Sequence, residues 1–151
     1  MRNFELTSES KINEQGVLLY RIKYTKENKK YCIKAGDLGG WIEKIENISG
    51  DALVSGNAKV YCDAKVYGYA KVSGNARVYQ IRDVCYFSPF GSRNDTTTEY
   101  RTNNEIDIVC GCFRGNLEKF IERIKTTHGN SYIAKEYLAI CEVIKIRFES
   151  K

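Results

Sequence analysis

The chain has 151 residues, of which 42% are hydrophobic and 28% charged, and a formal net charge of +5. A chain of this length can bury roughly 68% of its unfolded surface as one compact domain. No apolar run approaches the roughly 18 residues of a membrane span, and the N-terminal segment lacks the apolar core of a signal peptide. The sequence therefore predicts a cytoplasmic protein without a membrane segment, and its modest charge makes a nucleic-acid partner unexpected.

The N-terminal residues 1–36 contain three β-prone segments, 3–7, 16–25 and 30–34, which polar turns separate. They predict a small antiparallel β cap. The adjacent glycines at 39–40 predict a tight bend just before Trp41, the only tryptophan. An open end of a repeat would expose apolar side chains and unpaired backbone groups, so Trp41 is expected to plug such an end.

One eight-residue phrase occurs twice, as V-S-G-N-A-K-V-Y at 54–61 and V-S-G-N-A-R-V-Y at 72–79. The two copies belong to a G-x-A-x-V-x hexad that spans residues 50–79. Side chains two apart in a strand share a face, so the alanines and valines point inward. Glycines, with Cys62 in place of one of them, supply corners where the chain needs positive φ. The inward residues are Ala52, Ala58, Ala64, Ala70, Ala76, Val54, Val60, Val66, Val72 and Val78.

Three hexads close one triangular coil of 18 residues, which predicts a short parallel β-helix over residues 37–85. Residue n then lies over residue n+18, about 4.8 Å away. Asn57 is expected over Asn75, Lys59 over Arg77, and Tyr61 over Tyr79. Slightly fewer than three coils is a short stack for a repeat fold, so the rest of the chain must cap it. Oligomerisation through a flat outer face is expected to add further stability.

Residues 86–151 do not follow the hexad pattern. Segments 84–90, 96–102 and 105–113 read as strands, with a hairpin between the last two. Asn116 is a helix N-cap, and His128-Gly129 ends that helix. A second helix begins at about Ser131, so the tail is predicted to be a β-hairpin followed by an αα-hairpin. The fold class is mainly β.

Six cysteines in a cytosolic chain are expected to be reduced and mostly buried. Cys110 and Cys112 form a C-x-C pattern that, in a strand, places both sulfurs on one face. The C-x₂-C spacing and the histidine partners of a zinc site are missing. A packing role is therefore expected for this pair, and no metal site is predicted.

The phrase K-A-G-D-L-G-G-W-I-E-K-x-E-N-I-S at 34–49, followed by G-N-A-x-V-Y repeats, resembles hexapeptide-repeat putative transferases of bacteria and phages. The tail, from S-P-F-G-S-R-N-D-T-T-T to T-H-G-N, is similar to that of short phage-type members. The resemblance implies a left-handed β-helix, a homotrimer and ligand sites between subunits. Two features depart from the enzymes of this superfamily: glycine stands one place later in the hexad, and the repeats contain no histidine.

The strongest candidate for specific binding is a polar loop whose backbone N–H groups, hydroxyls and guanidinium suit a phosphate or carboxylate. Arg114 and Gly115, next to the first C-terminal helix, are expected to join it. Turn formation is the competing explanation, with Arg93 paired to Asp95 or Asp107. The predicted ligand-binding residues are Gly91, Ser92, Arg93, Asn94, Asp95, Thr96, Thr97, Thr98, Arg114 and Gly115.

A second candidate face contains Lys59, Tyr61, Arg77 and Tyr79, where cations beside aromatic rings suit a planar anion or a partner protein. The competing explanation is that these stacked side chains form a solvated edge of the coils or a contact between subunits of a trimer. An acyltransferase would need a base, and the only histidine is His128, in the helical tail. A helix C-terminus favours histidine for structural reasons alone.

The sequence therefore favours a non-enzymatic oligomeric binding protein over an enzyme. Similarity to phage-type members implies an accessory or anti-defence protein in the host cytoplasm, which inhibits a host protein or sequesters a small anionic, nucleotide-like ligand. No cofactor is predicted for that function. The alternative is a hexapeptide-type acyltransferase that uses an acyl-CoA donor and His128.

Overall fold

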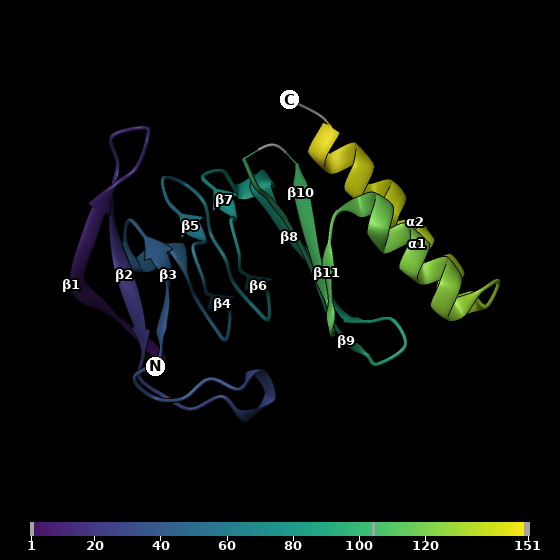
Figure 1. Cartoon of the computed structure of the whole chain (residues 1–151), viewed down its shortest axis with the longest axis horizontal. Coiled ribbons are helices and arrows are strands. Elements are labelled where there is room, and N and C mark those ends of the chain that lie inside the picture. The colour runs from purple at the N-terminus through teal and green to yellow at the C-terminus, as the bar shows by residue number, and fades with distance from the viewer. Residues whose placement is uncertain (1, 104, 150–151) are drawn as a thin grey trace.

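Four layers follow one another along the long axis of the molecule (Figure 1). The structure is a computed structural model that describes residues 2–103 and 105–149. An N-terminal hairpin comes first, then a stack of short parallel strands, then an antiparallel sheet, and two helices last. The prediction of a mainly β chain with a helical tail is confirmed.

The first layer is the hairpin of β1 (Phe4–Ile12) and β2 (Leu18–Tyr24), and β2 also pairs with β3 (Leu38–Ile42). The predicted strand at 30–34 is wrong. Lys29–Tyr31 form a 3-10 turn because the Asn28 carbonyl accepts the N–H groups of both Tyr31 and Ile33. The cap therefore contains two long strands and a protruding turn.

The second layer consists of parallel strand pairs at an offset of 18 residues. Leu53 pairs with Lys71, and Lys59 with Arg77, as the repeat predicts. Trp41 pairs with Lys59, so β3 begins the stack one coil earlier. The strands of this coil segment are β4 (Leu53–Val54), β5 (Lys59–Val60), β6 (Lys71–Val72) and β7 (Arg77–Val78).

The interior of the coil segment is confirmed as small and aliphatic, since all five alanines and five valines of the hexads are at most 1% exposed. The corners also follow the prediction. Gly56 and Gly74 lie over one another with φ near +62°, and Cys62 adopts φ +53° in the place of a glycine. The hexad therefore dictates both the inward faces and the turns.

Side chains outside the repeat provide hydrogen-bond partners for backbone groups at both ends of the coil segment. The Tyr24 hydroxyl accepts from Val54 N at 2.9 Å and donates to Val54 O at 2.8 Å, so it replaces the strand that a preceding coil would supply. At the other end, Lys71 N donates to Thr98 Oγ1 at 3.0 Å. Backbone groups at exposed strand edges need such partners. Burial raises the pKa of Tyr24 to about 12, so its phenol stays neutral.

Trp41 does not plug the open end, contrary to the prediction. Its ring packs outside the coils against Leu19 and Tyr61, and the Lys11 ammonium lies 3.9 Å from the ring centroid. Trp41 alternates with the inward-facing Ile42 along β3, so it must point outward. Phe4 and Tyr24 belong to the cluster that closes this end. The glycines at 39–40 form no bend and lie within β3.

The third layer is a four-stranded antiparallel sheet in the order β11-β10-β9-β8, larger than the predicted hairpin. The predicted strand at 105–113 is interrupted because Gly111 adopts φ +57° and reverses the chain. Cys110 and Cys112 therefore do not share a strand face. The strands are β8 (Val84–Phe90), β9 (Asp95–Arg101), β10 (Ile106–Cys110) and β11 (Phe113–Gly115).

Helices α1 (Leu117–His128) and α2 (Tyr132–Glu149) cover the sheet on the side away from the coils, as Figure 1 shows. Asn116 Oδ1 accepts from Lys119 N at 2.9 Å, which confirms the predicted N-cap. Successive strand residues point to opposite faces. Val109 accordingly joins the coil-side core, and Ile108 joins the core under the helices. The sheet thus separates two apolar cores.

Candidate functional site

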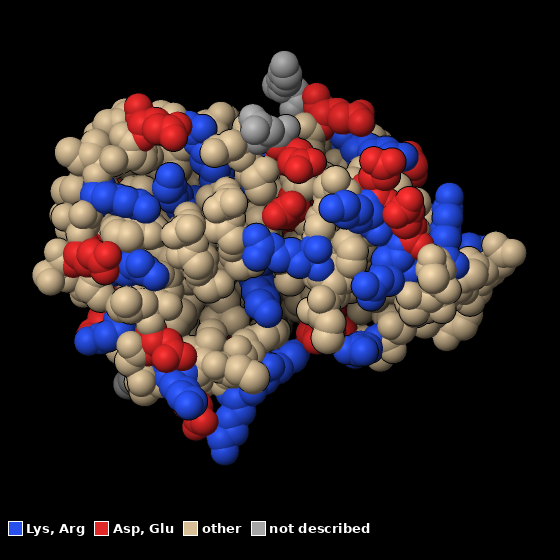
Figure 2. Space-filling view, viewed as in Figure 1, with Lys and Arg blue, Asp and Glu red and all other residues tan. Residues whose placement is uncertain are grey.

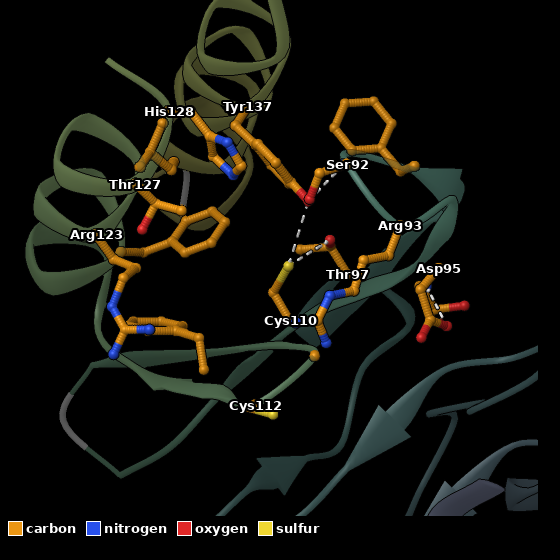
Figure 3. Close-up of a pocket in the computed structure, with 16 residues that line it drawn as sticks. Ser92, Arg93, Asp95, Thr97, Cys110, Cys112, Arg123, Thr127, His128 and Tyr137 are labelled. Carbon is orange, nitrogen blue, oxygen red and sulfur yellow. Dashed lines mark hydrogen bonds between the residues drawn. The ribbon is translucent and has the colours of Figure 1, made fainter.

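A half-open cavity of about 150 Å³ lies between the β8–β9 loop, the β10–β11 turn and the two helices. We call it the site cavity. Figure 3 shows its side chains converging from these separate segments. They are Phe90, Ser92, Arg93, Asp95, Thr96, Thr97, Cys110, Gly111, Cys112, Phe113, Phe120, Arg123, Ile124, Thr127, His128 and Tyr137.

Tyr137 of α2 holds the β8–β9 loop in place. Gly91 has φ +75°, and a Cβ there would lie 1.7 Å from the Tyr137 hydroxyl oxygen, so only glycine permits this approach. The next backbone N–H, that of Ser92, donates to the same oxygen at 3.3 Å. Gly91 N donates to Glu136 Oε1, also at 3.3 Å. The sequence does not reveal this contact because 45 residues separate its partners.

The backbone N–H groups of the loop are largely occupied by internal acceptors. Besides the two bonds to α2, Asn94 N donates to Gly91 O at 3.3 Å and Thr96 N to Asp95 Oδ1 at 2.8 Å. An anion in the site cavity would therefore be held mainly by side chains, and not by the row of N–H groups that the sequence suggested.

Three basic side chains surround the site cavity. Arg93 extends from the loop and Arg123 from α1, on opposite walls (Figure 3). Arg123 lies 5.8 Å from the Phe113 ring centroid, and the His128 ring stacks on Tyr137 with centroids 5.7 Å apart. Within residues 2–103 and 105–149, none of the three makes an ion pair.

The acidic residue of the cavity wall is already paired. Asp95 Oδ1 lies 2.9 Å from Lys30 Nζ, in the turn that protrudes from the first layer. This hydrogen bond lowers the pKa of Asp95, which keeps the carboxylate ionised. The competing prediction that Arg93 pairs with Asp95 or Asp107 is wrong, because Asp107 pairs with Arg114 at 3.8 Å.

A row of neutral groups crosses the floor of the site cavity. The Thr97 hydroxyl donates to Cys110 Sγ at 3.3 Å, and the thiol donates to the Tyr137 hydroxyl at 3.7 Å (Figure 3). Burial, followed by the influence of Cys110, raises the pKa of Tyr137. The phenol therefore remains protonated near neutral pH and offers a hydrogen bond without a charge.

The structure brings together only part of the predicted ligand-binding set. Ser92, Arg93, Asp95, Thr96 and Thr97 line the site cavity. Gly91 and Asn94 shape the β8–β9 loop but do not line the site cavity. The remaining predicted residues lie elsewhere: Thr98 faces the coils, Arg114 covers Gly74 there, and Gly115 packs beside Phe113 and Lys119.

Sequence reasoning missed the helical and thiol side of the site. Arg123, Thr127 and Tyr137 are not among the predicted site residues, and His128 is predicted only as the end of the helix or as an alternative base. The spacing of Arg123 and Thr127, four residues apart, indicates one helix face. It does not indicate that this face meets the β8–β9 loop.

The second candidate face is partly buried. The rings of Tyr61 and Tyr79 stack with centroids 5.9 Å apart, as the 18-residue offset predicts, but Tyr61 is only 2% exposed. Arg77 Nε donates to the Tyr61 hydroxyl at 3.1 Å. Lys59 and Arg77 line a polar groove of about 610 Å³ with Asn57 and Asn75. Tyr61 is therefore unavailable as a surface for a planar ligand.

Charge is mixed on the face that Figure 2 shows, where acidic and basic side chains alternate over the coils and the sheet. Among the described residues, no group of three His, Cys, Asp or Glu side chains is placed to hold a metal ion. No helix in the described ranges is long and apolar enough to cross a bilayer. Comparisons with protein-family models, curated proteins and solved structures gave no match.

Proposed function

We propose that this chain is a non-enzymatic binding protein that holds a small anionic ligand in the site cavity. The observation that carries the proposal is the set of three basic side chains, Arg93, Arg123 and His128, around one cavity without an ion pair in the described parts of the chain. The one carboxylate in the wall is neutralised by Lys30. An anion would satisfy the two guanidinium charges of Arg93 and Arg123, which the described parts of the chain leave uncompensated, and His128 could add a hydrogen bond.

The biological role that we propose is sequestration of a nucleotide-like ligand, or inhibition of a host protein, by a phage-type accessory or anti-defence protein. We propose further that the coil segment is a short left-handed β-helix and that the chain assembles as a homotrimer in the cytoplasm. The 18-residue offset of the parallel strands supports a β-helix. The family resemblance supports the handedness and the trimer.

Thermal melting with a panel of nucleotides and inorganic phosphate tests the binding proposal. At a ligand concentration 100 times Kd, binding stabilises the folded state by about 2.7 kcal/mol, or roughly 5 to 10 °C for a chain of this length. We expect Arg93→Ala and Arg123→Ala to remove this gain. Lys125→Ala, which takes the same charge from the exposed face of α1, should preserve it. An equal loss in all three variants would indicate nonspecific charge attraction.

The second candidate function is acyl transfer, and the position of His128 in the cavity wall favours it. A histidine near a bound acceptor hydroxyl is a suitable general base. In the structure the imidazole stacks on Tyr137, beside the loop that carries Ser92. Under this alternative, acetyl-CoA should be hydrolysed or transferred by the native chain, and His128→Ala should lower the rate by about 100-fold or more. Equal rates in both proteins would remove this mechanism.

A further inference from the structure

The floor of the site cavity is buried and mostly apolar, whereas its rim is exposed and basic. Phe120, Ile124 and Tyr137 on the floor are 2 to 5% exposed, and Thr97 is 1% exposed. Arg93 and Arg123 on the rim are both exposed. A ligand that fits this arrangement has an uncharged end, which enters the floor, and an anionic end, which stays between the two guanidinium groups.

The volume of the site cavity suits a single ring as the uncharged end of the ligand. The cavity measures about 150 Å³, and a cavity of that volume accommodates one benzene-sized ring. Phe120 and Tyr137 stand nearly perpendicular, with an interplanar angle of 85° and centroids 5.9 Å apart. The two rings pack edge to face against each other, which fixes the aromatic wall that a ring in the cavity would meet. A fused double ring exceeds a benzene-sized space and would extend toward the open side of the cavity, away from the floor.

The polar row on the floor suits a ring with hydrogen-bonding atoms on its edge. The Thr97 and Cys110 hydrogens are used within the row, so the groups left for a ligand are the Tyr137 O–H and the lone pairs of the Thr97 hydroxyl. A pyrimidine base alternates carbonyl and N–H groups along its edge. A plain benzene ring would leave the Tyr137 O–H without an acceptor, at a cost in binding free energy.

We infer that the ligand is a pyrimidine nucleoside monophosphate, with its base on the floor beside Thr97 and its phosphate between Arg93 and Arg123. This inference rests on the proposed function and narrows it to one ligand class. Isothermal titration of the native chain with uridine monophosphate, adenosine monophosphate, ribose 5-phosphate and inorganic phosphate tests it. We expect the pyrimidine nucleotide to bind at least tenfold more tightly than each of the other three.

Two variants separate the base from the phosphate. Thr97→Val keeps the side-chain volume but removes a hydroxyl from the floor, so it should weaken uridine monophosphate about tenfold and leave ribose 5-phosphate unchanged. Arg93→Ala should weaken both. Tighter binding of adenosine monophosphate, or equal binding of ribose 5-phosphate, would overturn the inference and leave the proposed anion site intact. Failure of every anion to bind would overturn both.

Discussion

Glu99→Gln is expected to remove a large pH dependence from the stability of this protein. Glu99 lies on β9 and is 0% exposed, and the carboxyl receives a hydrogen bond from the Cys85 thiol at 3.1 Å. Its other oxygen has no partner in the described part of the chain. Burial raises the pKa of Glu99 to about 8, even though the Cys85 hydrogen bond acts in the opposite direction.

The sign of the effect follows from proton linkage. The folded chain keeps the Glu99 proton up to about pH 8, whereas the unfolded chain releases it at about 4.5. Between these values the folded state binds one more proton, so the free energy of unfolding falls as pH rises. The slope is about 1.4 kcal/mol per pH unit, and the total is on the order of 5 kcal/mol. The stabilisation is fully present below pH 4.5 and lost by about pH 8.

Urea unfolding at intervals between pH 4.5 and 9 measures this dependence. We expect Glu99→Gln to flatten the curve and to be more stable than the native chain above pH 8, because glutamine carries no charge to bury. Glu122→Gln, at an exposed position of α1, is the matched control and should leave the curve unchanged. Parallel curves for native and Glu99→Gln chains would show that the buried carboxyl does not titrate in this range.

The coil segment could be predicted from sequence because its information is local. Each hexad fixes an inward alanine, an inward valine and a corner, so the pairing of Lys59 with Arg77 and the left-handed φ of Cys62 follow from the period alone. Helix α1 was predictable for a similar reason, because Asn116 caps it within three residues.

The rest depends on contacts between distant segments. The sequence around Tyr24 does not indicate that its hydroxyl hydrogen-bonds the backbone of Val54, 30 residues away. The site cavity likewise depends on a long-range contact, since Tyr137 meets the β8–β9 loop across 45 residues. The loop of the candidate site was predicted from its polar residues, but its partners on α1 and α2 follow only from how the helices cover the sheet.

Gly40→Ala is expected to cause a large loss of stability, because it adds a methyl group where the backbone of β3 lies close to the first coil. Gly40 lies 18 residues before Ala58 and occupies the inward place that alanine holds in later coils. A Cβ at Gly40 would lie 2.8 Å from the Ala58 carbonyl oxygen and 2.7 Å from a Val54 methyl group. The backbone oxygen cannot move without disturbing the pairing of β3 with β5.

Overpacking of a close-packed interior costs about 1 to 3 kcal/mol, and contact with backbone atoms places Gly40→Ala at the upper end, about 3 kcal/mol. The melting temperature should fall by roughly 6 to 12 °C. Gly16→Ala is the control: its Cβ would meet nothing within 4 Å, but φ is +81°, so it should cost only about 1 to 2 kcal/mol. If Gly40→Ala melts no lower than Gly16→Ala, the close approach of β3 to the first coil is wrong, and with it the placement of Trp41 outside the stack.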